Sequence, residues 1–184
     1  ILLREGHEVV IYDNFSRGSK FYLDDVGKYS IINGDIRDKS SLLSAFENVE
    51  VIIHLAAYGS VVESVKNPIE NYSINAEGTF NVLNAAREAG VKKFIFASST
   101  MHNMNHVYGT LKKLGEEYTS RLGGLSVRFW NVYGPEKSSP KSHVIADLIH
   151  KHKTKGYIDL MTSGEERRQF LHTEDCAKAL TQLM

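Results

Sequence analysis

A tyrosine and a lysine four residues apart are the side chains of this sequence best suited to acid–base chemistry. Tyr108 and Lys112 belong to the segment Tyr-Gly-Thr-Leu-Lys, and on a helix this spacing places both on one face, about one turn apart. A phenol normally keeps its proton until about pH 10. An ammonium about 6 Å away, at an effective dielectric constant of about 20, favours the phenolate by about 3 kcal/mol, or roughly two pKa units. The pair is therefore a candidate base with its activator, although an exposed helical pair without function has the same spacing.

Hydroxyl side chains precede this pair at the end of an apolar run. Residues 94–97 read Phe-Ile-Phe-Ala, which is typical of a buried parallel strand, and Ser98, Ser99 and Thr100 follow. A hydroxyl at a strand end is able to polarise a substrate oxygen on which a proton is exchanged. The candidate catalytic residues are therefore Tyr108, Lys112, Thr100, Ser99 and Ser98.

Composition limits the classes of protein to which the chain can belong. Its 184 residues suit one domain or slightly more, and 22 Lys and Arg balance 22 Asp and Glu, which argues against nucleic acid or an anionic membrane as the main partner. The single Cys176 excludes an internal disulfide and fits a reducing cytoplasm. No apolar run approaches the roughly 20 residues that span a bilayer, and the start lacks a signal-peptide pattern. We expect a cytoplasmic protein.

Two histidine pairs make a metal site worth considering. His102 and His106 have a four-residue spacing, and His150 lies close to His152. No cysteine or carboxylate completes either ligand set at a usual spacing, so we expect no metal.

The order of elements predicts the class of fold. Apolar runs at 7–13, 30–36, 49–57, 91–99, 125–134 and 157–161 indicate strands, and helical patterns are found at 40–47, 69–90, 108–123 and 141–152. Such alternation predicts an α/β protein with a Rossmann-like, doubly wound parallel sheet. A small substrate-binding lobe begins after about residue 133.

Several motifs, in the same order along the chain, resemble those of a known family. They are the acidic Asp13 after a strand, the Asn-x-x-Gly-Thr segment from Asn75, the Tyr-x-x-x-Lys pair, and Arg-Phe-Trp-Asn-Val-Tyr-Gly-Pro from Arg128. Together they resemble the extended short-chain dehydrogenase/reductases, in the branch of NAD-dependent epimerases and dehydratases that includes UDP-glucose 4-epimerase-like enzymes. The resemblance implies NAD as cofactor and a nucleotide-sugar as substrate.

The resemblance also implies which residues contact the cofactor. An acidic residue after the second strand of such a fold binds the adenosine ribose and repels a 2′-phosphate, so Asp13 favours NAD over NADP, although Asp-Asn before Ser-Arg-Gly also forms a turn. Asp35 is expected near the adenine amine, Ile36 against its ring, Leu55 to Ala57 beside the diphosphate, and Phe129 beside the nicotinamide. The full set is Asp13, Asn14, Asp35, Ile36, Leu55, Ala56, Ala57, Asn75, Tyr108, Lys112 and Phe129.

The substrate residues implied by the resemblance lie towards the C-terminal end. Trp130 and Asn131 are expected at the nucleotide-sugar, and Arg168 is expected to hold its diphosphate with bidentate donors. Residues 1–134 are then the NAD-binding domain, and residues 135–184 are part of the substrate-binding region.

Two features depart from the family pattern. No glycine-rich loop precedes Ile1, so we expect an internal piece of a longer protein that lacks the first strand and the C-terminal remainder. Met101 and His102 stand where dehydratases of this group carry an Asp-Glu pair, and the loop before Tyr108 is short. The absence of that pair makes dehydration the less favoured reaction.

The favoured function is an NAD-dependent nucleotide-sugar epimerase that oxidises the sugar to a keto intermediate and reduces it again. The alternatives are a nucleotide-sugar 4-keto reductase or dehydratase of the same family, or a non-catalytic NAD(P)-sensing protein. The resemblance further implies a homodimer formed through the helices near 70–90 and 108–123. Whether the isolated chain turns over without a glycine-rich loop is left open.

Overall fold

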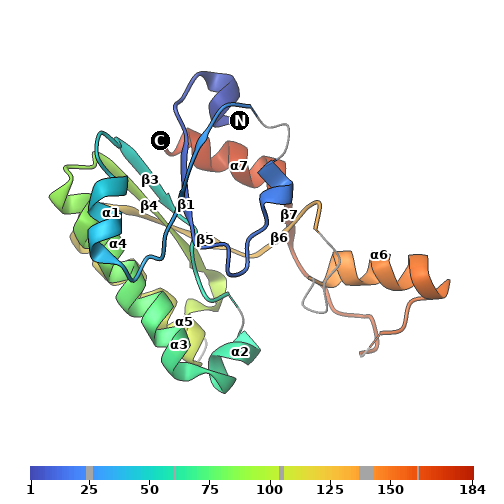
Figure 1. Cartoon of the computed structure of the whole chain (residues 1–184). Helices are drawn as coiled ribbons and strands as arrows, with labels where there is room; N and C mark the ends of the chain where they lie inside the picture. Colours follow the sequence, from blue (N-terminus) through green and yellow to red (C-terminus); the bar gives the residue numbers. More distant parts are fainter. Residues whose placement is uncertain (24–26, 60, 104–105, 137–142, 161) are drawn as a thin grey trace. The chain divides into compact units, whose positions relative to one another are not determined.

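The computed structural model describes residues 1–23, 27–59, 61–103, 106–136, 143–160 and 162–184 (Figure 1). The chain divides into two compact units, which are described separately. The first unit comprises Ile1–Phe129 with Leu183–Met184, and the second comprises Trp130–Gln182.

Parallel strands form the framework of the first unit. One sheet pairs β1 (Val10–Asp13) with β2 (Ser30–Asn33), and the other has the order β3 (Val51–His54), β4 (Lys93–Ser99), β5 (Leu125–Phe129). Parallel neighbours need crossover connections, and helices supply them here. The predicted α/β class is therefore confirmed.

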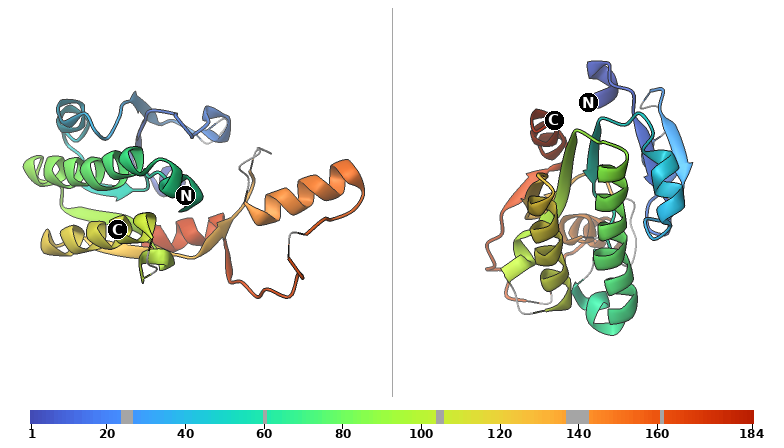
Figure 2. Two further views of the ribbon diagram at one scale, coloured as in Figure 1. Left: turned by 90° about the horizontal axis from the view of Figure 1, so that it is seen from below. Right: turned by 90° about the vertical axis from the view of Figure 1, so that its left-hand side faces the viewer.

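Helices connect the strands of the first unit. The α-helices are α1 (Lys39–Ala45), α2 (Val61–Lys66), α3 (Pro68–Tyr72), α4 (Thr79–Glu88) and α5 (Val107–Arg121). Short 3-10 helices are η1 (Leu2–Glu5), η2 (Lys20–Leu23) and η4 (Thr100–Asn103). Helices α4 and α5 run side by side along the three-stranded sheet (Figures 1 and 2).

Side chains at their N-terminal ends fix where two of these helices begin. The Asp38 carboxylate accepts hydrogen bonds from the amides of Ser40 and Ser41, at 3.1 and 3.2 Å, so the cap predicted there is confirmed. His106 caps α5, where its Nδ1 accepts a hydrogen bond of 2.9 Å from the Gly109 amide. This cap places Tyr108 in the first turn of α5, close after the end of β4.

A helix predicted over 69–90 contains a π-helical segment. Helix α3 continues into the π-helix η3 (Ser73–Gly78), and α4 follows it directly. Wide π-turns inside α-helices are rare and frequently lie at functional sites. Asn75 lies within this segment and is 2% exposed.

One apolar cluster joins both sheets of the first unit with helices α1 and α4. Its most buried members include Leu42 of α1 and Phe96 of β4. Helix α5 approaches β4 so closely that a Cβ added to Gly115 would lie 2.5 Å from Phe96 Cζ. A glycine is therefore required at this helix–strand contact.

The second unit contains a small parallel pair and two helices. Strands β6 (Asn131–Tyr133) and β7 (Phe170–His172) pair, and the helices are α6 (Val144–Lys155) and α7 (Thr173–Gln182). The strand predicted at 157–161 is wrong for 157–160, where the side chains are exposed and no strand forms; Met161 lies outside the described residues. The strand predicted at 125–134 breaks at Trp130, because β5 pairs with β4 whereas β6 pairs with β7.

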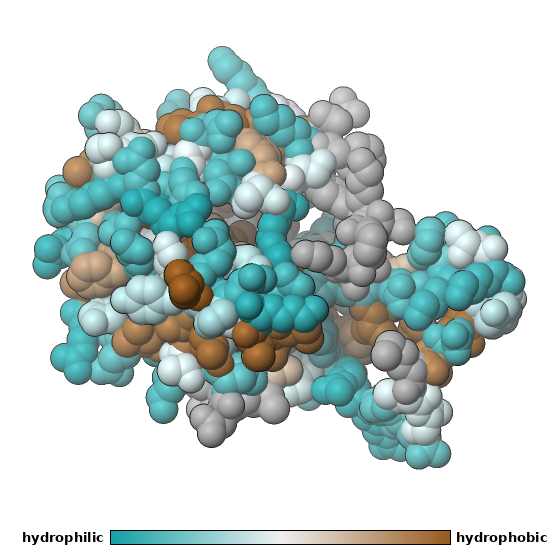
Figure 3. Space-filling model, turned by 60° about the horizontal axis from the view of Figure 1, so that its bottom comes forward, coloured by the Kyte–Doolittle hydropathy of each residue, from teal (hydrophilic) through white to brown (hydrophobic). Residues whose placement is uncertain are grey.

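Figure 3 shows one face of the molecule, on which apolar side chains form several areas between hydrophilic ones. Large exposed apolar residues on the helices of the first unit include Ile69, Tyr72, Phe80, Leu114, Tyr118 and Leu122. Among the described helices, none is long and apolar enough to cross a membrane.

Candidate active site

A phenol and a hydroxyl meet where β4 ends and α5 begins. Strand β4 is buried from Phe94 to Ser98, and its last residue, Ser99, is half-buried. The Tyr108 side chain, in the first turn of α5, shares a hydrogen bond with Ser99. The carboxyl end of this strand thus holds a donor–acceptor pair, in the position where open parallel sheets place their ligands.

Lys112 lies one helical turn after Tyr108 and is 4% exposed. Its Nζ donates a hydrogen bond of 2.7 Å to the Ala97 carbonyl oxygen. The same atom lies 4.8 Å from the centroid of the Phe96 ring and 5.9 Å from that of Tyr108. The amine is therefore held against the strand end, on the face of α5 that carries the phenol.

Burial controls the protonation of both groups. Removal from water lowers the pKa of Lys112 to about 8, and it raises the pKa of Tyr108, an effect that the hydrogen bond with Ser99 partly opposes. The lowered pKa predicted for Tyr108 is therefore wrong for this structure. Coulomb's law between the two groups left out the cost of desolvating a phenolate.

The candidate hydroxyls have different surroundings. Ser99 bonds with Tyr108, whereas Ser98, which is 3% exposed, donates to the carboxylate of Glu116 on α5. Thr100 begins η4 and is half-buried. Ser99 is thus the hydroxyl of this group that the structure joins to Tyr108.

A histidine at the end of β3 lies beside this cluster. His54 is 5% exposed, and its Nε2 lies 3.2 Å from Thr79 Oγ1. Burial, and secondarily the charge of Lys112, lowers the pKa of His54 to about 3, so the imidazole is neutral at ordinary pH. It packs with its ring tilted against Phe94 and Phe96.

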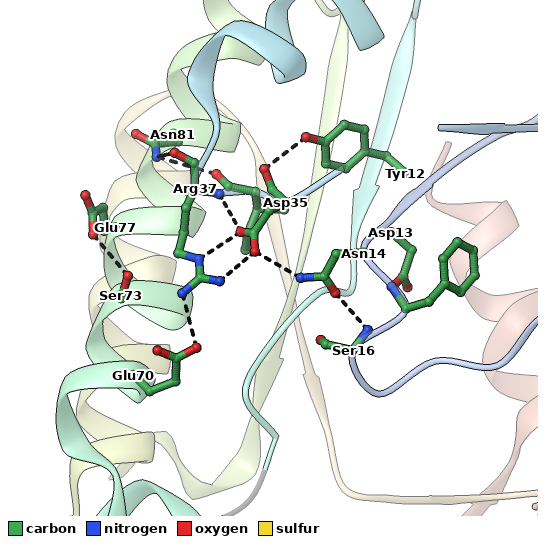
Figure 4. Close-up of polar contacts among 12 residues, drawn as sticks. Tyr12, Asp13, Asn14, Ser16, Asp35, Arg37, Glu70, Ser73, Glu77 and Asn81 are labelled. Carbon is green, nitrogen blue, oxygen red and sulfur yellow. Dashed lines mark hydrogen bonds and ion pairs between the residues drawn. The ribbon is translucent and has the colours of Figure 1, made fainter. Parts of the chain in front are cut away.

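Acidic and amide side chains form a second cluster at the ends of β1 and β2 (Figure 4). Asp13 Oδ1 accepts a hydrogen bond of 2.7 Å from the Phe15 amide, which closes the turn after β1. The Asn14 Nδ2 donates to Asp35 at 3.0 Å, while its Oδ1 accepts from the Ser16 amide. Asp13 thus closes a turn, which was the alternative to ribose binding considered for it. Asn14 connects the ends of β1 and β2.

Arg37 accounts for the state of Asp35. The Asp35 carboxylate receives hydrogen bonds from the Arg37 amide, Nε and Nη2 at 2.9, 2.9 and 2.6 Å, and from Asn14. These bonds, the Arg37 side chain foremost, hold the pKa of Asp35 well below its usual range. The remaining arm of Arg37 reaches Glu70 of α3 at 3.1 Å (Figure 4). A further donor to Asp35, such as the adenine amine, must share an oxygen that already accepts two bonds.

The other expected cofactor residues divide between core and surface. Ile36 is 8% exposed in the apolar cluster, where a Cβ on Gly78 would lie 2.6 Å from its Cδ1. Leu55 and Ala56 are exposed after β3, and Ala57 is half-buried. Phe129 ends β5 opposite Ser99 in the parallel register. Leu55 to Ala57 are therefore available to a ligand, and Ile36 packs inside the protein.

Asn75 of the π-helix fixes the loop that follows β3. Its Oδ1 accepts a hydrogen bond of 2.8 Å from the Tyr58 amide, and its Nδ2 donates at 3.1 Å to the Tyr58 carbonyl oxygen. The guanidinium carbon of Arg17 lies 4.6 Å from the centroid of the Tyr58 ring. These contacts of Tyr58 were not predictable, because Arg17 and Asn75 are distant from it in the sequence, one before it and one after it.

The substrate residues expected in the second unit are close to one another along β6 and β7. Asn131 Nδ2 donates at 3.0 Å to the carbonyl oxygen of Gln169, the neighbour of Arg168. Arg168 is exposed, as is Trp130 at 46%. Within this unit, the structure brings Asn131 and the Arg168 segment together.

The residues of the first unit suit a dinucleotide. Asp13 ends β1, small residues follow β3, and Ser99 ends β4, so all three stand at carboxyl ends of parallel strands. In open α/β sheets, ligands bind at this edge. The fold and these side chains define the class of α/β proteins that bind dinucleotides.

Comparison with known proteins identifies the family within that class. The model of the NAD dependent epimerase/dehydratase family matches residues 1–123 and 104–184. A UDP-glucose 4-epimerase of Klebsiella pneumoniae is 38% identical over 120 residues, which are 61% of this chain and 83% of that protein. The chain belongs to the NAD dependent epimerase/dehydratase family.

Other relatives are longer than this chain. A UDP-N-acetyl-alpha-D-glucosaminuronate decarboxylase of Bacillus cytotoxicus is 32% identical over 205 residues, covering 97% of this chain and 64% of the relative. A Methanocaldococcus jannaschii relative, 34% identical over 203 residues, is covered to 66%. The chain thus spans about two thirds of the length of these relatives.

Solved structures of the same family confirm the Rossmann-like fold. The crystal structure of UDP-glucose 4-epimerase from Thermotoga maritima with UDP-glucose aligns with a TM-score of 0.91 at 25% identity, over all of this chain and 67% of that one. The UDP-glucose 4-epimerase of Thermus thermophilus in complex with NAD aligns with a TM-score of 0.80 at 28% identity, over 98% and 68%.

Proposed function

We propose that the protein to which this chain belongs is an NAD-dependent nucleotide-sugar epimerase. The observation that carries the proposal is the hydrogen bond between Tyr108 and Ser99, beside the buried amine of Lys112. The family and the named activities of several relatives support the same conclusion. Their substrates make a UDP-sugar the substrate to test first.

Tyr108 acts as the base in the proposed reaction. In its phenolate form, Tyr108 accepts the proton of a sugar hydroxyl, while Ser99 holds the phenol oxygen by a hydrogen bond. Because burial raises the pKa of Tyr108, this form needs the positive charges of Lys112 and of bound NAD, which would also supply the acceptor for the hydride from the same carbon. If that hydride returned to the opposite face of the keto sugar, with the proton from Tyr108, the product would be the epimer with no net NADH.

Lys112 holds the ribose next to the nicotinamide and stabilises the phenolate. With a pKa of about 8, it is still mostly protonated near neutral pH. Among the residues that the structure describes, the hydrogen-bond partner of its amine is the Ala97 carbonyl oxygen, which leaves ammonium donors for a ribose hydroxyl.

The remaining assignments extend this proposal over the two units. Asp13, Asn14 and Asp35 bind adenosine, and Leu55 to Ala57 border the diphosphate. Residues 1–134 bind NAD and residues 135–184 contribute to substrate binding, where Asn131 and Arg168 contact the nucleotide-sugar. The bond from Asn131 to the Gln169 carbonyl supports the placement of these two residues in one subsite.

Replacement of Tyr108 by Phe tests the proposal. Turnover of UDP-glucose by the whole protein is expected to fall by about 10³-fold or more, because the proton acceptor is lost, while NAD remains bound. Retained turnover would contradict the role of Tyr108. Net NADH consumption would indicate the reductase alternative, and loss of water would indicate a dehydratase. An inert protein that still binds NAD would indicate the sensing alternative.

A homodimer in the cytoplasm completes the proposal. Phe80 of α4 and Tyr118 of α5 stack edge to face at 5.3 Å, yet both are at least 40% exposed. Leu114 and Leu122 extend this apolar surface along α5. A free, buried Cys176 fits a reducing compartment. Sedimentation of the whole protein as a monomer at micromolar concentration would contradict the dimer.

A further inference from the structure

A nearly buried carboxylate on α5 binds both neighbouring strands. The Glu116 side chain is 13% exposed. It accepts a hydrogen bond from the Ser98 hydroxyl of β4, and it accepts from Arg128 Nε and Nη2 of β5 at 2.9 and 2.7 Å. Ser98 and Arg128 face each other in the parallel register of these strands. One carboxylate thus joins three elements at the end of the sheet.

Glu116 continues the helical spacing of the catalytic pair. Tyr108, Lys112 and Glu116 follow one another at intervals of four residues, so they lie along one face of α5. Each of them bonds to a different residue at the end of β4: Tyr108 to Ser99, Lys112 to Ala97 and Glu116 to Ser98. Three successive turns of the helix are therefore bonded to three neighbouring strand residues, in the order Ser99, Ala97 and Ser98.

Apolar packing alone does not fix the position of α5 along the strand. Gly115 packs closely against the edge of the Phe96 ring, and such a contact is non-directional. Hydrogen bonds restrict both distance and angle. The bidentate bond with Arg128 is the most restrictive of those on this helix face.

We propose that Glu116, held by Ser98 and Arg128, is a positioning residue that keeps Tyr108 and Lys112 in register with Ser99. The proposal rests on the epimerase function proposed above. In this role Glu116 acts through the helix, by way of its bonds to Ser98 and Arg128. Misplacement of reacting groups by about 1 Å costs about 10²-fold in rate, so a small slide of α5 has a large effect.

The variant Glu116→Gln tests this role in the whole protein. It keeps the shape and one acceptor but removes the charge and one of the paired bonds to Arg128. We expect kcat for UDP-glucose to fall about 10-fold to 100-fold, with KM and the amount of bound NAD within about twofold of wild type. A purely structural role would instead lower NAD binding and thermal stability together with the rate.

Glu117→Gln is the matched control. Glu117 is the next residue on the same helix, its side chain is 62% exposed, and it bonds to Arg121. The same chemical change there is expected to leave kcat unchanged. An active wild type with equal kcat in the Glu116 and Glu117 variants would overturn the inference and leave the proposed function standing. An inactive wild type that binds NAD would overturn both.

A second variant covers the case in which Glu116→Gln does not fold. The triple replacement Ser98→Ala, Glu116→Met and Arg128→Met removes the polar network together, and apolar replacement of such networks is often neutral for stability. We expect this protein to fold and bind NAD with kcat still at least about 10-fold below wild type. Wild-type kcat in the triple variant would overturn the inference.

Discussion

Arg37 and Lys112 are two cations of the first unit that lie near the ends of parallel strands, but they are held in different ways. Arg37 has a side chain that is 35% exposed, and it bonds to the carboxylates of Asp35 and Glu70, which raise the pKa of its guanidinium. Lys112 is 4% exposed, bonds to a neutral carbonyl oxygen, and has its pKa lowered to about 8 by burial. The charge of Arg37 is neutralised by carboxylates at a partly exposed site. The amine of Lys112 is buried, and among the described residues the structure records no carboxylate within bonding distance of it.

From this difference we infer that Arg37 contributes to binding and that Lys112 contributes to the proposed reaction. A cation with paired carboxylates near water contributes mainly to geometry, since exposed ion pairs stabilise a protein by about 1 kcal/mol at most. A buried amine without a carboxylate partner costs stability, but it places a titratable donor beside the proposed base, Tyr108. We therefore expect changes at Lys112 to alter pH dependence and changes at Arg37 to alter cofactor affinity.

Lys112→Met is expected to have the largest effect on the pH dependence of the free energy of unfolding, because it removes the buried charge. The folded pKa of about 8 lies below the unfolded value of about 10.4, so the unfolded state binds more protons between these values. The burial of protonated Lys112 costs the most stability below about pH 8, and the free energy of unfolding increases as the pH rises above this value. The free energy of unfolding of wild type should therefore gain about 2 kcal/mol relative to Lys112→Met from about pH 7 to about pH 9.5.

Urea unfolding of both proteins across this pH range measures the difference. The range stops below pH 10 because the raised pKa of Tyr108 acts in the opposite direction above it: the folded state then keeps a proton that the unfolded state loses. Parallel pH profiles for the two proteins would show that Lys112 is not desolvated as the structure indicates.

Arg37→Met should have an intermediate effect, confined to cofactor binding. It leaves Asp35 with Asn14 as its side-chain partner and frees Glu70. We expect NAD affinity to weaken by up to about tenfold, stability to change by less than about 1 kcal/mol, and kcat at saturating NAD to stay the same. Isothermal titration with NAD provides the measurement, and Lys39→Met, which breaks the exposed pair with Glu88, is the control. A reduced kcat at saturating NAD would remove the proposed separation.

Arg121→Met should have the smallest effect. Arg121 and Glu117 form an exposed i,i+4 pair on the same helix as Lys112. Such pairs contribute about 0.3–0.5 kcal/mol, so the unfolding free energy should change by no more than this and turnover should not change. A larger change measured by thermal unfolding would mean that exposure does not distinguish the cations of α5.

The fold and the placement of Tyr108 and Lys112 on one helix face were predictable because both depend on local patterns. The apolar run before Ser98 marked β4, and a spacing of four placed Tyr108 and Lys112 on one helix face. The particular hydroxyl at Tyr108 was not predictable, since α5 bonds to Ser98 through Glu116 and to Ser99 through Tyr108, and the sequence does not show which turn of the helix meets which serine. The direction of the Tyr108 pKa was missed because burial is a property of the assembled protein.

The residues expected at adenosine show the same limit, because contacts between distant residues are not visible in the sequence. The place of Asp35 at the adenine stays a prediction. Its saturation by Arg37 and by the distant Asn14 depends on how the loops after β1 and β2 fold together. Ile36 likewise matched a motif and proved to pack in the core. Glu116 carried a signal that was overlooked, because it extends the four-residue spacing by one more turn.

The π-helix at Ser73–Gly78 has a consequence for deletions in this part of the chain. A π-turn holds an additional residue compared with an α-helical turn, and Asn75 uses this segment to reach both polar groups of the Tyr58 backbone. Deletion of a single residue there would allow an ordinary α-helix and keep the helical register of α3 and α4, but Asn75 would lose the wide turn from which it reaches Tyr58. Such a deletion is therefore expected to disturb the loop after β3 more than the packing of α4.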